Sequence, residues 1–203
     1  MMLPTHALVG MVLALPFALV APDAASHALL AGFVGGTLPD LDLYSGHRKS
    51  LHYPVYYSLF TVPAVLAAFV IPGPVTIAAA VLLLGAAVHC LTDSLGGGLE
   101  LRPWEGTSDR AVYNHYSERW IRPRRWVRYD GAPEDFMASA VLGGFLFTVV
   151  DGPFQAIVAL AVLVAGTYTV VRRLLPSIAT AIIALLPPHV QPLLPARYLE
   201  GEG

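Results

Sequence analysis

Long apolar stretches separated by short polar breaks follow one another along the chain. A membrane-spanning helix needs about 17–25 mostly apolar residues, and breaks such as Pro72-Gly73-Pro74 favour turns between such helices. A further apolar piece, Ile178–Leu186, is too short to span and is expected to lie at the interface or against the bundle. The pattern predicts an all-α, polytopic transmembrane bundle with about six crossings, at Thr5–Ala21, Ser26–Leu38, Tyr53–Ile71, Val75–Leu95, Phe136–Val150 and Phe154–Val171.

The composition and the placement of basic residues extend this interpretation. Hydrophobic residues make up 56% of the chain and charged residues only 13%, whereas an average soluble domain carries about 25% charged residues. Basic residues follow the second, fourth and sixth apolar segments and are lacking after the first, third and fifth. The positive-inside rule therefore places the basic loops and the N-terminus in the cytoplasm, and we expect a multi-pass protein of the plasma membrane.

The same features divide the chain into four regions. The arginines of the long central loop are roughly balanced by acids, so no nucleic-acid interface is expected there. The first apolar segment lacks a basic flank, so we expect it to be retained rather than cleaved as a signal peptide. The regions are a membrane half with the candidate site, an arginine-rich cytoplasmic loop, two further transmembrane helices, and an interfacial segment with a tail: residues 1–104, 105–133, 134–173 and 174–203.

Small residues recur every four positions in the second apolar segment, at Ala28, Gly32 and Gly36. Such spacing lets two membrane helices approach closely. We therefore expect this segment to pack tightly against a neighbour.

Ionisable side chains from four separate segments are predicted to meet at the cytoplasmic side of the membrane. His89 and Asp93 are four residues apart inside an apolar run, so they share one helix face. Ionisable groups at membrane depth are costly and indicate a functional site, although a buried His–Asp hydrogen bond that ties helices together is an equal alternative. The full set is His6, Asp40, Asp42, His47, His52, His89 and Asp93.

The two carboxylates of Pro39-Asp40-Leu41-Asp42 follow the end of a helix, because proline disfavours helical conformation in the residue before it. Carboxylates this close repel each other unless a cation or a proton is present. A solvated turn is the competing interpretation, since aspartate is common in turns.

Imidazole and carboxylate groups without thiolates are typical of zinc, manganese, iron or nickel sites. The single cysteine, Cys90, excludes an internal disulfide and a cysteine-rich metal site. We expect a divalent cation, zinc or manganese before the others, and leave open whether His115 lines its site; His27 and His189 are expected to take no part. The predicted ligands of one or two ions are His6, Asp40, His52, His89 and Asp93.

These motifs together resemble the membrane-bound metal-dependent hydrolases, a family that includes the LexA-binding inner-membrane hydrolases of bacteria. The resemblance covers roughly residues 5–104 and rests on Thr5-His6, the Gly36–Asp42 turn, the His47–His52 loop, His89-x-x-x-Asp93 and Gly97–Trp104. It implies a metal site and hydrolysis but no particular substrate. Leu51 stands where many relatives have Thr or Ser, and the segment from Arg110 to Asp130 matches no core part of the family and looks like an archaeal elaboration.

The expected chemistry is hydrolysis, in which a divalent cation lowers the pKa of a water molecule towards neutrality. Asp42 is expected to be a further ligand or the general base, and Arg48 to clamp an anionic group such as phosphate. The depth of the site, and a weaker similarity of motif order to zinc-dependent phospholipase C enzymes, favour a phosphoester or lipid-linked substrate drawn from the membrane lipid. A transporter and a non-catalytic membrane scaffold remain alternatives.

Overall fold

The computed structural model describes residues 1–43, 45–187 and 189–190. Within these residues the chain forms seven α-helices, which agree to within a few residues with the seven predicted apolar segments. The predicted tail from residue 191 onwards lies outside the described residues. The helices are α1 (Leu3–Val20), α2 (Ala25–Thr37), α3 (Pro54–Val70), α4 (Pro74–Asp93), α5 (Pro133–Val149), α6 (Pro153–Val171) and α7 (Leu175–Ala184).

Proline marks the beginning of most of these helices. It occupies one of the first two helical positions in α1, α3, α4, α5, α6 and α7. The fixed φ of proline suits the first helical turn, where its missing N–H has no intrahelical partner to lose. The helix boundaries are therefore encoded locally, which is why the sequence pattern predicts them well.

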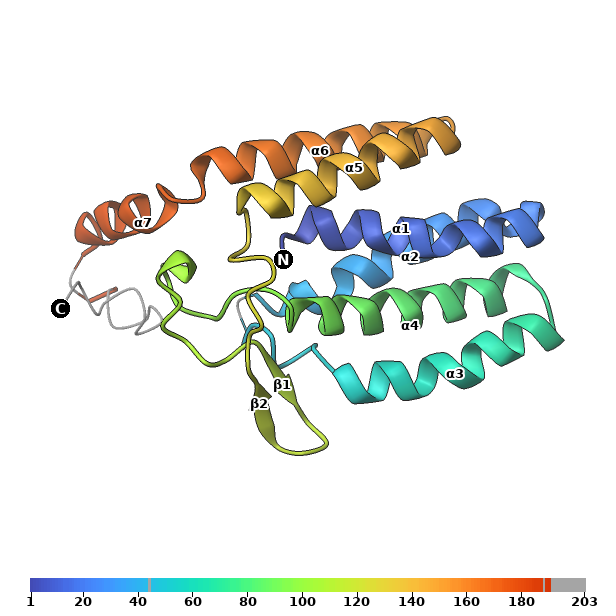
Figure 1. Cartoon of the computed structure of the whole chain (residues 1–203), viewed down its shortest axis with the longest axis horizontal. Coiled ribbons are helices and arrows are strands. Elements are labelled where there is room, and N and C mark those ends of the chain that lie inside the picture. Colours follow the sequence, from blue (N-terminus) through green and yellow to red (C-terminus); the bar gives the residue numbers. More distant parts are fainter. Residues whose placement is uncertain (44, 188, 191–203) are drawn as a thin grey trace.

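Helices α1 to α6 lie side by side, and α7 extends beyond the end of the bundle where the N-terminus lies (Figure 1). Helix α2 packs against both α1 and α4, α3 packs on α4, and α5 and α6 pack on α1. Among the described residues, α1, α4 and α6 are long and apolar enough to cross a membrane. The other predicted crossings are shorter, with 13 residues in α2 and 17 each in α3 and α5.

A small hairpin interrupts the helical fold, so the all-α prediction overlooks one element. Strands β1 (Val112–Asn114) and β2 (Arg119–Ile121) pair antiparallel in the arginine-rich loop, with Tyr113 opposite Trp120. Three-residue strands are too short for a recognisable alternating pattern. The Tyr113 N–H donates to the carbonyl of Arg48 at 2.9 Å, which fixes the hairpin to the loop that carries the predicted site residues.

Helix α2 contacts both neighbours through bare backbone, as its small-residue spacing predicts. A Cβ atom on Gly32 would lie 2.2 Å from the Gly10 carbonyl oxygen, and one on Gly36 would lie 2.2 Å from that of His6. On the other side, a Cβ on Gly35 would lie 2.3 Å from the Leu82 carbonyl oxygen. These contacts confirm the close packing and bring α1, α2 and α4 together at the level of His6 and His89.

Candidate metal centre

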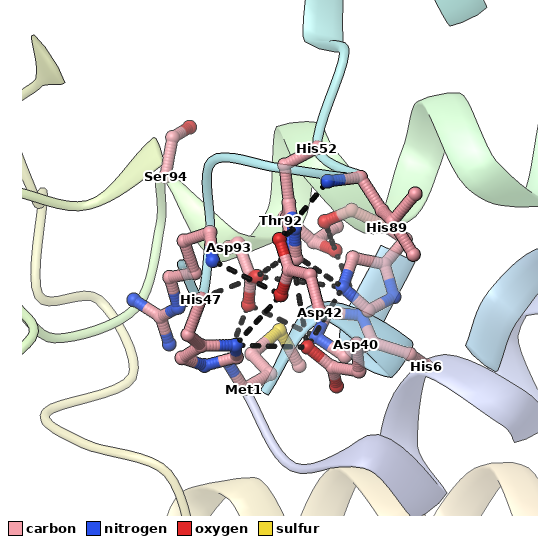
Figure 2. A network of polar contacts seen from close by, with 12 residues as sticks. Met1, His6, Asp40, Asp42, His47, His52, His89, Thr92, Asp93 and Ser94 are labelled. Atoms are coloured by element: carbon pink, nitrogen blue, oxygen red, sulfur yellow. Dashed lines mark hydrogen bonds and ion pairs between the residues drawn. The ribbon is translucent and has the colours of Figure 1, made fainter. Parts of the chain in front are cut away.

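Four predicted ligands converge at the end of the bundle that also holds the N-terminus (Figures 1 and 2). Asp40 comes from the 3-10 turn Leu38–Asp42 that follows α2, and His52 comes from the segment just before α3. His89 and Asp93 lie one turn apart on α4. His52, His89 and Asp93 are at most 1% exposed, whereas the side chain of Asp40 is 12% exposed.

The ligand atoms of these four residues lie within 4.8 Å of one another. His89 Nε2 is 3.2 Å from His52 Nε2, 3.4 Å from Asp40 Oδ1 and 3.4 Å from Asp93 Oδ2. His52 Nε2 is 3.7 Å from Asp40 Oδ1 and 3.3 Å from Asp93 Oδ2. Metal–ligand bonds of about 2.0–2.2 Å in a tetrahedral site place the ligand atoms about 3.3–3.6 Å apart, so the spacing fits one small cation.

The hydrogen bonds on the far side of each imidazole determine which ring nitrogen faces the centre as an acceptor. His89 Nδ1 donates to the Gly36 carbonyl at 2.7 Å, and His52 Nδ1 donates to Asp42 Oδ2 at 3.0 Å. Each neutral ring then presents the lone pair of Nε2 inward. Asp93 Oδ2 is buried and has no hydrogen-bond partner among the described residues. Lone pairs at this separation repel each other unless a cation or an additional proton lies between them.

Asp42 contacts the Nδ1 side of the His52 ring, away from Nε2, and is not among the four ligand atoms. Its fully buried carboxylate also accepts from His47 Nδ1 at 3.1 Å. Burial would raise the pKa of Asp42, but the hydrogen bonds from His47 and His52 outweigh it and hold this pKa well below its usual value. Three backbone N–H groups complete the carboxylate's surroundings, those of Arg48, Lys49 and Leu51.

Arg48 is buried beside the centre with a left-handed backbone, φ 59°, which few residues other than glycine adopt. Its Nη1 donates to the Gly97 carbonyl at 2.8 Å, and its Nε lies 3.5 Å from Asp93 Oδ2. Burial would lower the pKa of the guanidinium, but the negative charge of Asp93 raises it. The permanent positive charge thus lies next to the cluster of acceptors.

His6 supports the centre from outside the four-atom group. Its Nε2 lies 3.0 Å from Asp93 Oδ1, which also accepts from the Met1 amino group at 2.8 Å. Its ring stacks on His89 with centroids 3.7 Å apart. These contacts hold one Asp93 oxygen, so that the other, Oδ2, faces His52 and His89.

The remaining histidines lie elsewhere. His115 Nε2 bonds to the Lys49 carbonyl at 2.7 Å, and its ring lies 4.5 Å from that of Tyr53, so it supports the site loop rather than the four ligand atoms. His27 and His189 are exposed and do not belong to the group.

Several supporting groups are not evident from the sequence. The Gly36 carbonyl orients His89, and the Thr92 hydroxyl lies 3.3 Å from His6 Nδ1. The Thr5 hydroxyl donates to Asp135 Oδ1 at 2.7 Å, which joins α1 to α5 near the site. The positions of the two threonines beside predicted site residues give a signal, since Thr92 lies between His89 and Asp93 and Thr5 precedes His6, but their partners cannot be inferred from the sequence.

A cavity of about 620 Å³ adjoins the centre. Of the four ligand residues, Asp40 alone lines it, together with His47 and Arg48. The other three are at most 1% exposed, so this cavity reaches the centre from the side of Asp40.

No protein-family model, curated protein or solved structure matches this chain. What the centre can do therefore follows from its own side chains. The described residues form a mostly helical protein with three helices able to cross a membrane and a buried Asp40–His52–His89–Asp93 group that could hold a metal ion.

Proposed function

We propose that this protein is an integral membrane, metal-dependent hydrolase that acts on a phosphoester or lipid-linked substrate at the cytoplasmic face. The observation that carries the proposal is the convergence of two imidazole nitrogens and two carboxylate oxygens within 4.8 Å of one another, with each nitrogen 3.2–3.7 Å from the other three atoms. The basic loops and the candidate centre lie at one end of the bundle (Figure 1), which supports six crossings with that end in the cytoplasm. The resemblance to membrane-bound metal-dependent hydrolases agrees with this function.

The residues around the centre have distinct roles in this proposal. When bound, a zinc or manganese ion supplies Lewis acidity, polarising the scissile group and activating water. Asp40, His52, His89 and Asp93 would hold the ion. Asp42 and the Gly36 carbonyl are positioning groups, because they fix the orientation of His52 and His89 by accepting hydrogen bonds from Nδ1–H of each ring.

His47 is a better general base than Asp42. The Asp42 carboxylate is buried and already accepts two imidazole donors and three backbone N–H groups. His47 bonds to Asp42 through Nδ1, which leaves Nε2 to take a proton, and its side chain lines the cavity. A carboxylate behind an imidazole orients the ring and stabilises it once protonated. The Arg48 charge beside the centre favours an anionic group on the substrate.

The test is the metal content of purified protein, determined by mass spectrometry for wild type, His89→Ala and His27→Ala. We expect about one equivalent of divalent metal in the wild type and in His27→Ala, whose histidine is exposed on α2. His89→Ala should lose the metal together with any hydrolysis of phosphomonoesters and phosphodiesters. Absence of metal from the wild type after loading with zinc and manganese would refute the proposal.

A metal-free scaffold is the second candidate function, and the hydrogen bonds of the same cluster favour it. His89 joins α4 to α2 through the Gly36 carbonyl, and His6 joins α1 to α4 through Asp93. In a scaffold these hydrogen bonds hold the helices together without a bound ion. Chelator treatment would then leave the thermal stability of the wild type unchanged, whereas loss of a bound ion from the hydrolase should lower it.

A further inference from the structure

The cavity beside the candidate centre changes from polar to apolar along its walls. Asp40, His47 and Arg48 line it near the centre. The opposite wall is formed by α6 and α7. Apolar side chains from these helices and from the N-terminal and 98–101 segments form much of the remaining surface, among them Leu3, Leu99, Leu101, Val164, Ile178 and Ile182. Glu100, Asp130, Tyr168 and Arg172 are the further polar residues of the lining.

Helix α7 contributes one continuous apolar face to this wall. Leu175, Ile178, Ala179 and Ile182 all line the cavity and follow the i, i+3, i+4, i+7 spacing of one helix face. No residue of α7 carries a charge. The side chains of Ile178 and Ile182 line the cavity yet remain 47% and 55% exposed, so the apolar wall continues onto the outer surface of the protein.

The charged residues of the lining are Asp40 and Arg48 near the centre, the Asp130–Arg172 pair, and Glu100. Arg48 is held between the Gly97 carbonyl and Asp93, close to the four ligand atoms. Arg172 also lines the cavity, but its guanidinium makes two hydrogen bonds to Asp130, at 3.0 and 3.1 Å. Arg48 is itself paired with Asp93, so the attraction for an anion at this end depends on Arg48 together with a cation bound by the neighbouring ligand residues.

We propose that the cavity binds a phosphate-bearing amphiphile, with its phosphate at the Asp40–His47–Arg48 end and its alkyl chain along α6 and α7. This inference rests on the proposed function for its headgroup end and adds the substrate class. A volume of about 620 Å³ is within the usual range for ligand sites, about 300–1,000 Å³. Because the apolar wall reaches the outer surface, a chain can pass from the bilayer into the cavity without leaving an apolar environment.

The experiment uses full-length, metal-loaded protein in lipid nanodiscs and an octyl phosphate with a photoreactive group at the chain end. We expect labelling to map to α6 and α7. Octyl phosphate should compete at least tenfold better than butyl phosphate or inorganic phosphate, because each added methylene transfers apolar surface from water to the cavity. Octanol, which lacks the phosphate, should compete at least tenfold more weakly than octyl phosphate.

Two matched substitutions on α7 distinguish binding in the cavity from binding at the lipid-facing surface of the protein. Ala179→Trp fills the cavity and should remove the advantage of octyl over butyl phosphate. Ala181→Trp adds the same side chain at an exposed position that does not line the cavity, and it should keep that advantage. Both variants should retain wild-type metal content.

Labelling spread over the whole apolar surface, or equal behaviour of the two variants, would overturn the amphiphile site. Equal competition by inorganic and octyl phosphate would also overturn it and would indicate a small soluble phosphate ligand. Because the readout is binding, these results differ from failure of the proposed function, which would show as a protein without metal and without hydrolysis.

Discussion

Helices α4 and α6 are nearly alike in sequence character but differ in their surroundings. Their apolar windows have mean hydropathies of 2.2 and 2.0, yet 44% of the α4 window is buried inside the protein and only 17% of the α6 window. Helix α4 packs against α1, α2 and α3, whereas α6 packs chiefly on α5 and α1. Hydropathy thus measures compatibility with an apolar environment and does not distinguish protein interior from lipid.

The difference between the two helices has a chemical basis in the small and polar residues of the first half of the chain. Glycines allow α1, α2 and α4 to touch through their backbones, and hydrogen bonds from His6 and His89 join the same three helices. In the described residues, the buried hydrogen bonds of α5 run to α1 through Asp135 and Ser139, whereas α5 and α6 are joined to each other by the Gln155–Phe147 bond. The pair leaves large apolar side chains such as Leu160 and Leu163 exposed. The first region is built as a rigid support for the candidate centre, and the second as a membrane-facing wall.

The largest expected effect on stability comes from adding one methyl group where the backbones of α1 and α2 touch. Gly32→Ala places a Cβ 2.2 Å from the Gly10 carbonyl oxygen, where neither backbone can move away cheaply. We expect a destabilisation of about 3 kcal/mol or more. It should appear as a much lower thermal unfolding midpoint in detergent, measured by circular dichroism.

The control for this substitution is a glycine of α5 where an added methyl group would touch no neighbouring helix. Gly144 is in the middle of α5, and a Cβ there would meet no atom within 4 Å. Gly144→Ala should be neutral or stabilising by up to about 1 kcal/mol, because alanine favours helix more than glycine does. A similar loss of stability in Gly32→Ala and Gly144→Ala would contradict the proposed difference in packing between α2 and α5.

A smaller effect is expected from loosening the support of the centre without removing a ligand. Asp42→Asn replaces an acceptor of five hydrogen bonds by an amide that can accept at only one atom. We expect metal affinity to fall about 10- to 100-fold, measured by competition with a fluorescent chelator. Asp23→Asn, near the opposite end of α1, should retain wild-type affinity. Unchanged affinity in Asp42→Asn would show that His52 does not depend on this carboxylate.

The smallest effect concerns an exposed ion pair at the beginning of α5. Hydrogen bonds from Arg128 lower the pKa of Glu134 from 4.5 to about 2. A lowered carboxyl pKa stabilises the fold fully above pH 4.5, and this contribution is lost as the pH falls through about 2. Since both side chains contact solvent, the contribution is small.

Comparison of wild type with Glu134→Gln isolates this contribution from other acid effects. The wild type should have a slightly higher unfolding midpoint at pH 7, and the difference should shrink progressively as the pH falls below 4.5. A difference that stays constant between pH 7 and pH 3 would mean that the pair does not contribute through its charge.

Local sequence signals account for the helices and for most of the candidate centre. Proline at the first helical turns and uninterrupted apolar runs determine the seven helices, because both act within a few residues. Topology then brings the carboxylates of the Pro39-Asp40 turn and the His89–Asp93 pair to one end of the bundle. Four of the five predicted ligands lie together for this reason.

Other features depend on contacts between residues distant in sequence and could not be predicted. His6 and Asp42 belong to the predicted set by residue type, but their hydrogen bonds to Asp93 and His52 place them around the four ligand atoms rather than among them. The hairpin at 112–121 is held to the site loop by the bond between the Tyr113 N–H and the Arg48 carbonyl. The residues around Tyr113 give no indication that its N–H bonds to the carbonyl of Arg48.

The sequence by itself determined where the helices begin and end, that several of them suit a membrane, and which side chains meet at one end. Only the tertiary structure decided which nitrogen of each histidine faces inward, which carboxylate lies outside the group of four ligand atoms, and which apolar face lines a cavity. The physical reason is the range over which each effect acts. Helix propensity, turn chemistry and hydropathy act over neighbouring residues. The geometry of the candidate ligands depends on hydrogen bonds between residues that are distant in sequence, such as His52 to Asp42, 10 residues apart, and His89 to Gly36, 53 residues apart.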